Sequence, residues 1–106
     1  MTKYYKIETY VPVAEAPRVR EAISAAGAGK FGAYDRCVWE TPGTGRFRPL
    51  EGSSPFIGRV GETEAVAELK IETFCAETAL AAVITALKAA HPYEVPAVYI
   101  METLLG

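Results

Sequence analysis

The chain has 106 residues, of which 50% are hydrophobic and 23% charged, a composition typical of one small folded domain rather than a disordered tail. Its 11 Lys and Arg are balanced by 13 Asp and Glu, which argues against a general nucleic-acid surface. No apolar run is long enough to span a membrane, no secretory signal is visible, and two cysteines are too few for a disulfide framework. We therefore expect a single cytoplasmic domain over residues 1–106 that binds neither nucleic acid nor membrane.

The first half of the chain changes from a strand pattern to a helix pattern and back. Side chains alternate with a period of two from Tyr4 to Val11, which predicts a half-buried strand, and Pro12 ends it. Apolar residues then recur at helical spacing between residues 14 and 26, before a glycine suited to a helix end. Residues 34–40 predict a second strand.

The second half repeats this order. Residues 64–74 alternate clearly, with Ala65, Ala67, Leu69 and Ile71 on the predicted buried face and Glu64, Glu68, Lys70 and Glu72 on a solvated face. Leu80, Val83, Ile84 and Leu87 mark an amphipathic helix that His91 and Pro92 close, and a last strand follows over residues 97–102. The order strand, helix, strand, strand, helix, strand predicts an α+β, ferredoxin-like βαββαβ sandwich. Its helices would leave one sheet face open, so we expect an oligomer.

A glycine-rich connection separates the two central strands. Eight of the nine glycines lie between Gly27 and Gly61. The pattern G-x-G-x-x-G at residues 27–32 follows a helix and leads into a strand, so it is not the dinucleotide-binding loop, which has the opposite order. Residues 41–61 form a long connection, typical of a functional loop or of extra pairing structure. Residues 30–59 carry five basic and three acidic side chains, so Arg46, Arg48 and Arg59 are candidates for anion binding, subunit contact or plain solvation.

His91 is the only histidine and therefore the first candidate for chemistry. It lies between the second helix and the last strand, where two prolines stiffen the corner. Its ring either caps the second helix by interacting with the last carbonyls and the helix dipole, or binds a ligand together with Glu94. A single histidine excludes a three-imidazole zinc site within one chain. A mixed site of His91, Glu94 and Cys37 remains, for which copper, nickel or zinc would be the expected ion. The alternative for Cys37 is a small packed side chain.

No pair of side chains is placed for general acid–base catalysis. Asp35 is the only aspartate, and nothing in the sequence brings it near His91. Because proton transfer needs an acid and a base within hydrogen-bond reach, a nucleotide or phosphate-ester hydrolase is the least favoured class. We therefore expect that the chain is not an enzyme.

Four ordered motifs resemble a known family. Gly27–Cys37, Gly43–Pro49, Pro55–Gly61 and His91–Ala97 together resemble the CutA-like domain inserted in YqfO-class, Nif-three-like proteins, which are labelled type 2 GTP cyclohydrolase I. The last motif is also similar to one in CutA divalent-cation tolerance proteins. The resemblance covers nearly the whole chain, and we expect the free-standing form in which this domain also occurs.

The resemblance implies a ferredoxin-like, CutA- and PII-like domain that assembles as a homotrimer. It does not imply hydrolase activity, because the metal-binding hydrolase part of those proteins is a separate domain. Two functions follow as expectations: a module that senses a metal ion or small anion, and an interaction module for a YqfO-class hydrolase or another partner. The positions that match the motifs and are expected at a ligand site are Tyr34, Cys37, His91, Tyr93 and Glu94.

Overall fold

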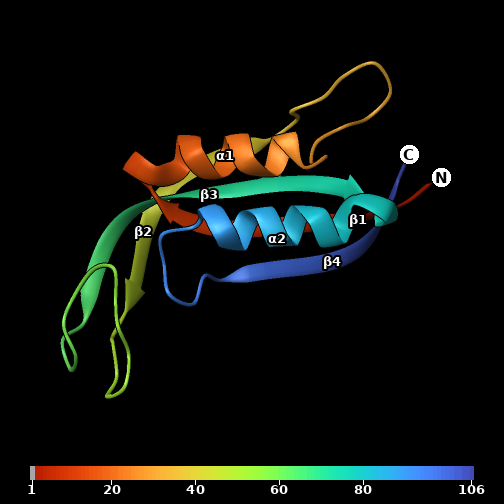
Figure 1. The fold of residues 1–106 in the computed structure, drawn as a ribbon. Helices are drawn as coiled ribbons and strands as arrows, with labels where there is room; N and C mark the ends of the chain where they lie inside the picture. The colour runs from red at the N-terminus through yellow and green to blue at the C-terminus, as the bar shows by residue number, and fades with distance from the viewer. Residues whose placement is uncertain (1) are drawn as a thin grey trace.

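The computed structural model describes residues 2–106 and contains one four-stranded antiparallel sheet with two helices on one face (Figure 1). The strands are β1 (Thr2–Pro12), β2 (Trp39–Phe47), β3 (Glu64–Ala76) and β4 (Val98–Leu105), and the helices are α1 (Ala16–Ala25) and α2 (Leu80–Ala90). The strand order across the sheet is β2-β3-β1-β4. This arrangement confirms the ferredoxin-like α+β fold. No helix among residues 2–106 is long and apolar enough to cross a membrane.

Both helices begin with a short 3-10 turn, at Val13–Glu15 and Glu77–Ala79. Pro17 lies in the first turn of α1, where a missing backbone N–H costs nothing. His91 follows α2 in an extended conformation, and its backbone N–H caps the helix at Leu87 O. The two predicted helices are thus confirmed, with α1 starting two residues later than the pattern suggested.

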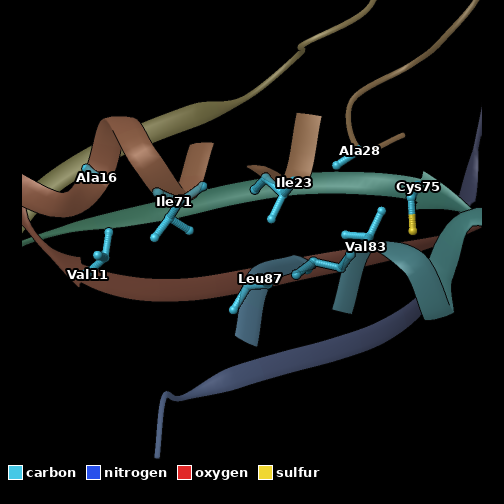
Figure 2. Close-up of a cluster of buried hydrophobic side chains, with 10 residues drawn as sticks. Val11, Ala16, Ile23, Ala28, Ile71, Cys75, Val83 and Leu87 are labelled. Carbon is cyan, nitrogen blue, oxygen red and sulfur yellow. The ribbon is translucent and has the colours of Figure 1, made fainter. Parts of the chain in front are cut away.

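The core lies between the helices and the two central strands (Figure 2). β1 and β3 pair with Tyr5 opposite Cys75 and Thr9 opposite Ile71. This register aligns the apolar positions of both strands toward α1 and α2. The fully buried members include Ile7, Val11, Val19, Ile23, Ile71, Cys75, Val83 and Leu87.

The predicted second strand is wrong in its position. Residues 35–38 have no regular structure, and β2 runs instead from Trp39 through Pro42 and two glycines to Phe47. Proline cannot donate a ladder hydrogen bond, but β2 is an edge strand, where one missing donor is tolerated. The predicted connection at 41–61 is therefore partly strand, and the true connection between β2 and β3 covers residues 48–63.

β2 and β3 extend beyond the helices as a curved arm, visible at the lower left of Figure 1. We call residues 41–69 the β2–β3 arm. Ala65 and Ala67, predicted to be buried, are exposed there because no helix covers this part of β3. The arm gives the molecule an elongated shape of 46 × 24 × 21 Å.

The sheet face opposite the helices, called the open face below, carries the even-numbered residues of β1 and β3 and their cross-strand neighbours. Lys6 and Lys70 form ion pairs of 3.0–3.7 Å with Glu8 and Glu72 at its centre. Tyr10 and Tyr99 pack edge to face at one end of this network, with ring centroids 6.2 Å apart. These four side chains thus pair with one another at the centre of the open face.

Candidate functional site

A cleft of about 710 Å³ lies between the β2–β3 arm and residues 93–97, which lead into β4. Its lining includes Tyr10, Phe47, Phe56, Glu68, Tyr93 and Tyr99, together with Arg46, Arg48 and Glu94. The volume is within the range of pockets that bind small organic ligands. Segments distant in the sequence therefore meet at one end of the open face.

The corner between α2 and β4 is held rigidly against the rest of the protein. Thr9 Oγ1 donates to Ala97 O at 2.9 Å, and Arg18 Nε donates to Ala90 O at the end of α2 at 2.9 Å. The His91 ring contacts Tyr10 O through Nε2 at 2.8 Å. These bonds fix the wall of the cleft that Tyr93 and Glu94 provide.

His91 is buried and both of its ring nitrogens are engaged. Tyr93 N donates to Nδ1 at 3.2 Å, so Nδ1 is the acceptor and Nε2–H is the donor to Tyr10 O. Burial lowers the pKa of His91 more than the bond to Tyr10 and the charge of Glu68 raise it. The neutral ring therefore holds the corner to β1 through Tyr10 O. The capping prediction was wrong about its partner, because the backbone N–H of His91, and not the ring, bonds to a carbonyl of α2.

Tyr93 and Glu68 form a hydrogen bond inside the cleft. The Tyr93 hydroxyl donates to Glu68 Oε2 at 2.5 Å, and the Glu68 side chain is only 7% exposed. Burial and the neighbouring carboxylate raise the pKa of Tyr93 far above its ordinary value. Tyr93 is consequently a neutral hydrogen-bond donor at physiological pH.

Glu68 was expected on a solvated face, and this expectation was wrong. Its carboxylate lies directly over Gly45 of the neighbouring strand, so close that a Cβ at Gly45 would overlap it. Gly43 is directly opposite Glu68 in the register, and the absence of a side chain at Gly45 leaves room for the carboxylate. The alternation of β3 gave no sign of this burial because Tyr93, which covers the carboxylate, comes from a remote segment.

Glu94 connects two loops at the rim of the cleft. Its Oε1 accepts a hydrogen bond from Ser54 N at 3.0 Å, which joins the 48–63 connection to the corner after α2. Arg46 and Arg48 also line the cleft, both are exposed, and neither takes part in a salt bridge among residues 2–106. Their positive charge therefore has no acidic partner in the described part of the chain.

Tyr34 and Cys37 lie elsewhere, at the end of the sheet where β1 begins. Tyr34 is 76% exposed beside Phe31, whose ring packs on Tyr4 and Phe74. Cys37 lies in a loop rather than a strand, and its carbonyl accepts a hydrogen bond from Thr73. No group of three or more His, Cys, Asp or Glu side chains in residues 2–106 is arranged to hold a metal ion.

The structure thus brings together Arg46, Arg48, Tyr93 and Glu94, with His91 directly behind them. Sequence reasoning missed Glu68 and the aromatic wall of Phe47 and Phe56. Tyr93 packs against these two rings with centroids 5.7 and 6.5 Å away. The Arg46-Phe47-Arg48 motif was the available signal for Phe47, but only the fold shows which residues Phe47 meets.

The sequence and the fold of this chain are similar to those of several known proteins. The chain is 47% identical over 93 residues to the GTP cyclohydrolase 1 type 2 homolog of Halalkalibacterium halodurans and 45% identical over 89 residues to that of Bacillus subtilis. It superposes on the Bacillus cereus protein related to NIF3 with a TM-score of 0.82 and 37% identity, over 96% of this chain. The chain is homologous to one segment of these proteins. No family model matches it.

These matches cover most of this chain but only a small part of each relative. They cover 88% and 84% of this chain but 25% and 24% of the two curated relatives, and 26% of the B. cereus structure. The chain therefore spans about a quarter of the length of the relatives it matches. CutA from Archaeoglobus fulgidus and CutA1 from Oryza sativa superpose with TM-scores of 0.68 and 0.69 at 22% and 21% identity, over 86% and 84% of their length. These likenesses confirm the CutA-like fold.

Proposed function

We propose that this chain is a non-catalytic, homotrimeric module that binds a small organic anion in the cleft and thereby regulates a partner. The observation that carries the proposal is the cleft of about 710 Å³, lined by two arginines that form no salt bridge with any of residues 2–106. An unpaired guanidinium is a strong donor to carboxylate or phosphate groups. The rigid corner behind Tyr93 and Glu94 supports a binding site that is preformed.

The chemistry of the cleft favours binding over catalysis. His91 has both ring nitrogens in hydrogen bonds with the backbone, and burial lowers its pKa further. The raised pKa of Tyr93 keeps its hydroxyl protonated and makes it a weak acid. The acidic residues of the lining are Glu68, which accepts a hydrogen bond from the Tyr93 hydroxyl, and Glu94, which accepts one from Ser54 N. None of these groups has the free partner that general acid–base catalysis needs.

An organic anion has more support than a metal ion. A metal site of His91, Glu94 and Cys37 would require the imidazole to give up one of its two hydrogen bonds. It would also require Cys37 to leave a loop that is bonded to the other end of β3. Arginine, by contrast, needs no rearrangement to bind an anion.

The open face supports the homotrimer. Trp39 is 69% exposed and Tyr99 56% exposed, and both lie on the side of the sheet that no helix covers. Burying such aromatic surface between copies of the chain would remove it from water. We place the assembly contacts on this face and the ligand at its end, where the β2–β3 arm begins.

Native mass spectrometry of the protein, purified without a metal-affinity tag, tests this proposal. We expect a trimer with a retained organic anion, or one that gains mass when small anions are added. Arg48→Ala should abolish this added mass, and Arg59→Ala, which removes the same charge outside the cleft, should keep it. A monomer, or retention of the anion by Arg48→Ala, would contradict the proposal.

A second candidate is an interaction module for a hydrolase of the YqfO class or another protein. It is supported by the relatives, in which the matching segment is about a quarter of a longer chain. This function predicts a trimer without any ligand and a partner that copurifies in a fixed ratio. A ligand bound by Arg48 would favour the first candidate instead.

A further inference from the structure

Glu68 is a buried carboxylate in the cleft without a basic partner. It is 7% exposed, and none of the salt bridges among residues 2–106 includes it. Its Oε2 accepts the Tyr93 hydroxyl, while no hydrogen bond to Oε1 is found within the same residues. Burying a charge is costly unless a charge of the opposite sign lies beside it. Glu68 therefore retains the capacity to pair with a cation.

The basic side chains of the cleft do not neutralise Glu68. Lys70, two positions further along β3, pairs instead with the two glutamates at the centre of the open face. Arg46 is opposite Ala65 in the register, so it lies on the other face of the arm from Glu68. Arg48 lies beyond the end of β2 and forms no salt bridge with any of residues 2–106.

The open face as a whole carries more negative than positive charge. Residues that are opposite each other in an antiparallel sheet project from the same face, so the register assigns the charged strand residues of this face. They are two basic and four acidic side chains, namely Lys6, Lys70, Glu8, Glu64, Glu68 and Glu72. Four of them pair at the centre of the face, which leaves the charges of Glu64 and Glu68 uncompensated. Such an excess attracts cations to this side of the molecule.

The cleft also has a wall of aromatic rings, which come from Tyr10, Phe47, Phe56, Tyr93 and Tyr99. Phe47 and Phe56 pack around Tyr93, and Phe56 and Tyr99 are still half-exposed. The face of an aromatic ring carries partial negative charge and attracts an ammonium group. The rings and the buried carboxylate thus favour the same kind of ligand.

We propose that the cleft binds an organic cation, with its ammonium N–H donating to Glu68 Oε1 and its apolar part against Phe47 and Phe56. A carboxylate oxygen can only accept a hydrogen bond, so the cation must carry an N–H group at this point. The inference goes beyond the proposed function, because it uses the Glu68 side of the cleft and neither arginine.

Isothermal titration calorimetry with three probes of similar shape tests the inference on the intact protein. Benzylammonium, the form of benzylamine at neutral pH, has an aromatic ring, a positive charge and N–H donors. Benzyl alcohol keeps the ring without the charge, and benzoate carries a negative charge instead. We expect benzylammonium to bind at least tenfold more tightly than benzyl alcohol, because the alcohol lacks both the cation–π attraction and the charge for Glu68.

Matched variants assign the contacts. Glu68→Gln removes the charge and should reduce the preference for benzylammonium over benzyl alcohol below about threefold. Glu62→Gln changes an exposed carboxylate outside the cleft and should keep the preference. Phe56→Ala removes a half-exposed ring, should preserve the fold and should weaken benzylammonium about fivefold. Circular dichroism and the Tm of each variant separate lost binding from lost folding.

The outcomes separate this inference from the proposed function. Equal binding of benzylammonium and benzyl alcohol by the unmodified protein overturns the inference, and so does an unchanged preference in Glu68→Gln. Either result leaves the proposed function intact if benzoate binds and Arg48→Ala abolishes its binding. If benzylammonium binds through Glu68 and no anion binds, the inference holds and the proposed function fails.

Discussion

The bond between Tyr93 and Glu68 makes a quantitative prediction about stability. Tyr93→Phe keeps the ring and its contacts with Phe47 and Phe56 but removes the donor to Glu68 Oε2. The carboxylate, 7% exposed, would then lose its hydrogen-bond donor. Leaving a buried charged acceptor unpaired costs about 2–3 kcal/mol. We expect this loss in the free energy of unfolding.

Urea unfolding followed by circular dichroism measures the loss. The unmodified protein and the variant are compared at one fixed concentration, since assembly makes stability depend on concentration. In a domain of this size the loss corresponds to a fall in Tm of roughly 8–20 °C. The same substitution is then made in a Glu68→Gln background, where the acceptor is neutral and the expected loss is only about 1 kcal/mol.

The double-mutant comparison decides whether the reasoning is right. A coupling of about 1–2 kcal/mol between the two positions is expected for groups in direct contact. If Tyr93→Phe costs the same in both backgrounds, the hydroxyl does not act through the charge of Glu68. A loss under about 0.5 kcal/mol in the unmodified background would refute the burial argument itself.

Three further predictions follow from the fold. Gly29 has φ +77°, and a Cβ there would lie 2.5 Å from backbone atoms of Cys37, so Gly29→Ala should destabilise the protein by more than about 2 kcal/mol. Gly52 has φ +94° but lies in open space, so Gly52→Ala should cost only about 1 kcal/mol. Urea unfolding of both variants measures the difference. Burial lowers the pKa of His91 below 6.5 in the folded protein, so the unfolded chain takes up a proton at a higher pH than the folded one. The free energy of unfolding should therefore fall as the pH drops below about 6.5. The free energy of unfolding of His91→Gln should fall less than that of the unmodified protein between pH 7 and pH 5. An equal fall in both proteins would contradict this prediction. Cys75 is fully buried and its thiol pKa is raised by burial, so iodoacetamide should label Cys37 alone in the native protein, as read by peptide mass spectrometry.

The fold was largely predictable because its helices and central strands follow regular patterns. β1, β3 and both helices bury one side of each element, and that burial requires the observed spacing of Ile7, Val11, Ile71 and Leu87. β2 was misplaced for the opposite reason. Its residues are mostly exposed at a sheet edge, so no burial imposes an alternation, and Pro42 with two glycines reads as a loop.

The candidate site was predictable only in part. His91, Tyr93 and Glu94 are neighbours in sequence, so a rigid corner places them together. Arg46 and Arg48 stood out by their charge. Glu68 did not, because its burial depends on Tyr93 and on the missing side chain of Gly45, and both come from other strands or loops. The alternation of residues within one strand cannot show that a side chain from a distant segment buries one of them.

β1 and β4 pair with Thr2 opposite Leu105, and the two ends of the chain lie side by side in Figure 1. Such neighbours are about 5 Å apart, so a module of this shape can replace a single peptide step in a surface loop of a larger host without separating the flanking segments. The cleft lies at the other end of β1, beyond Tyr10. Joined to a host at these two ends, the module would keep its cleft at the end that faces away from the host.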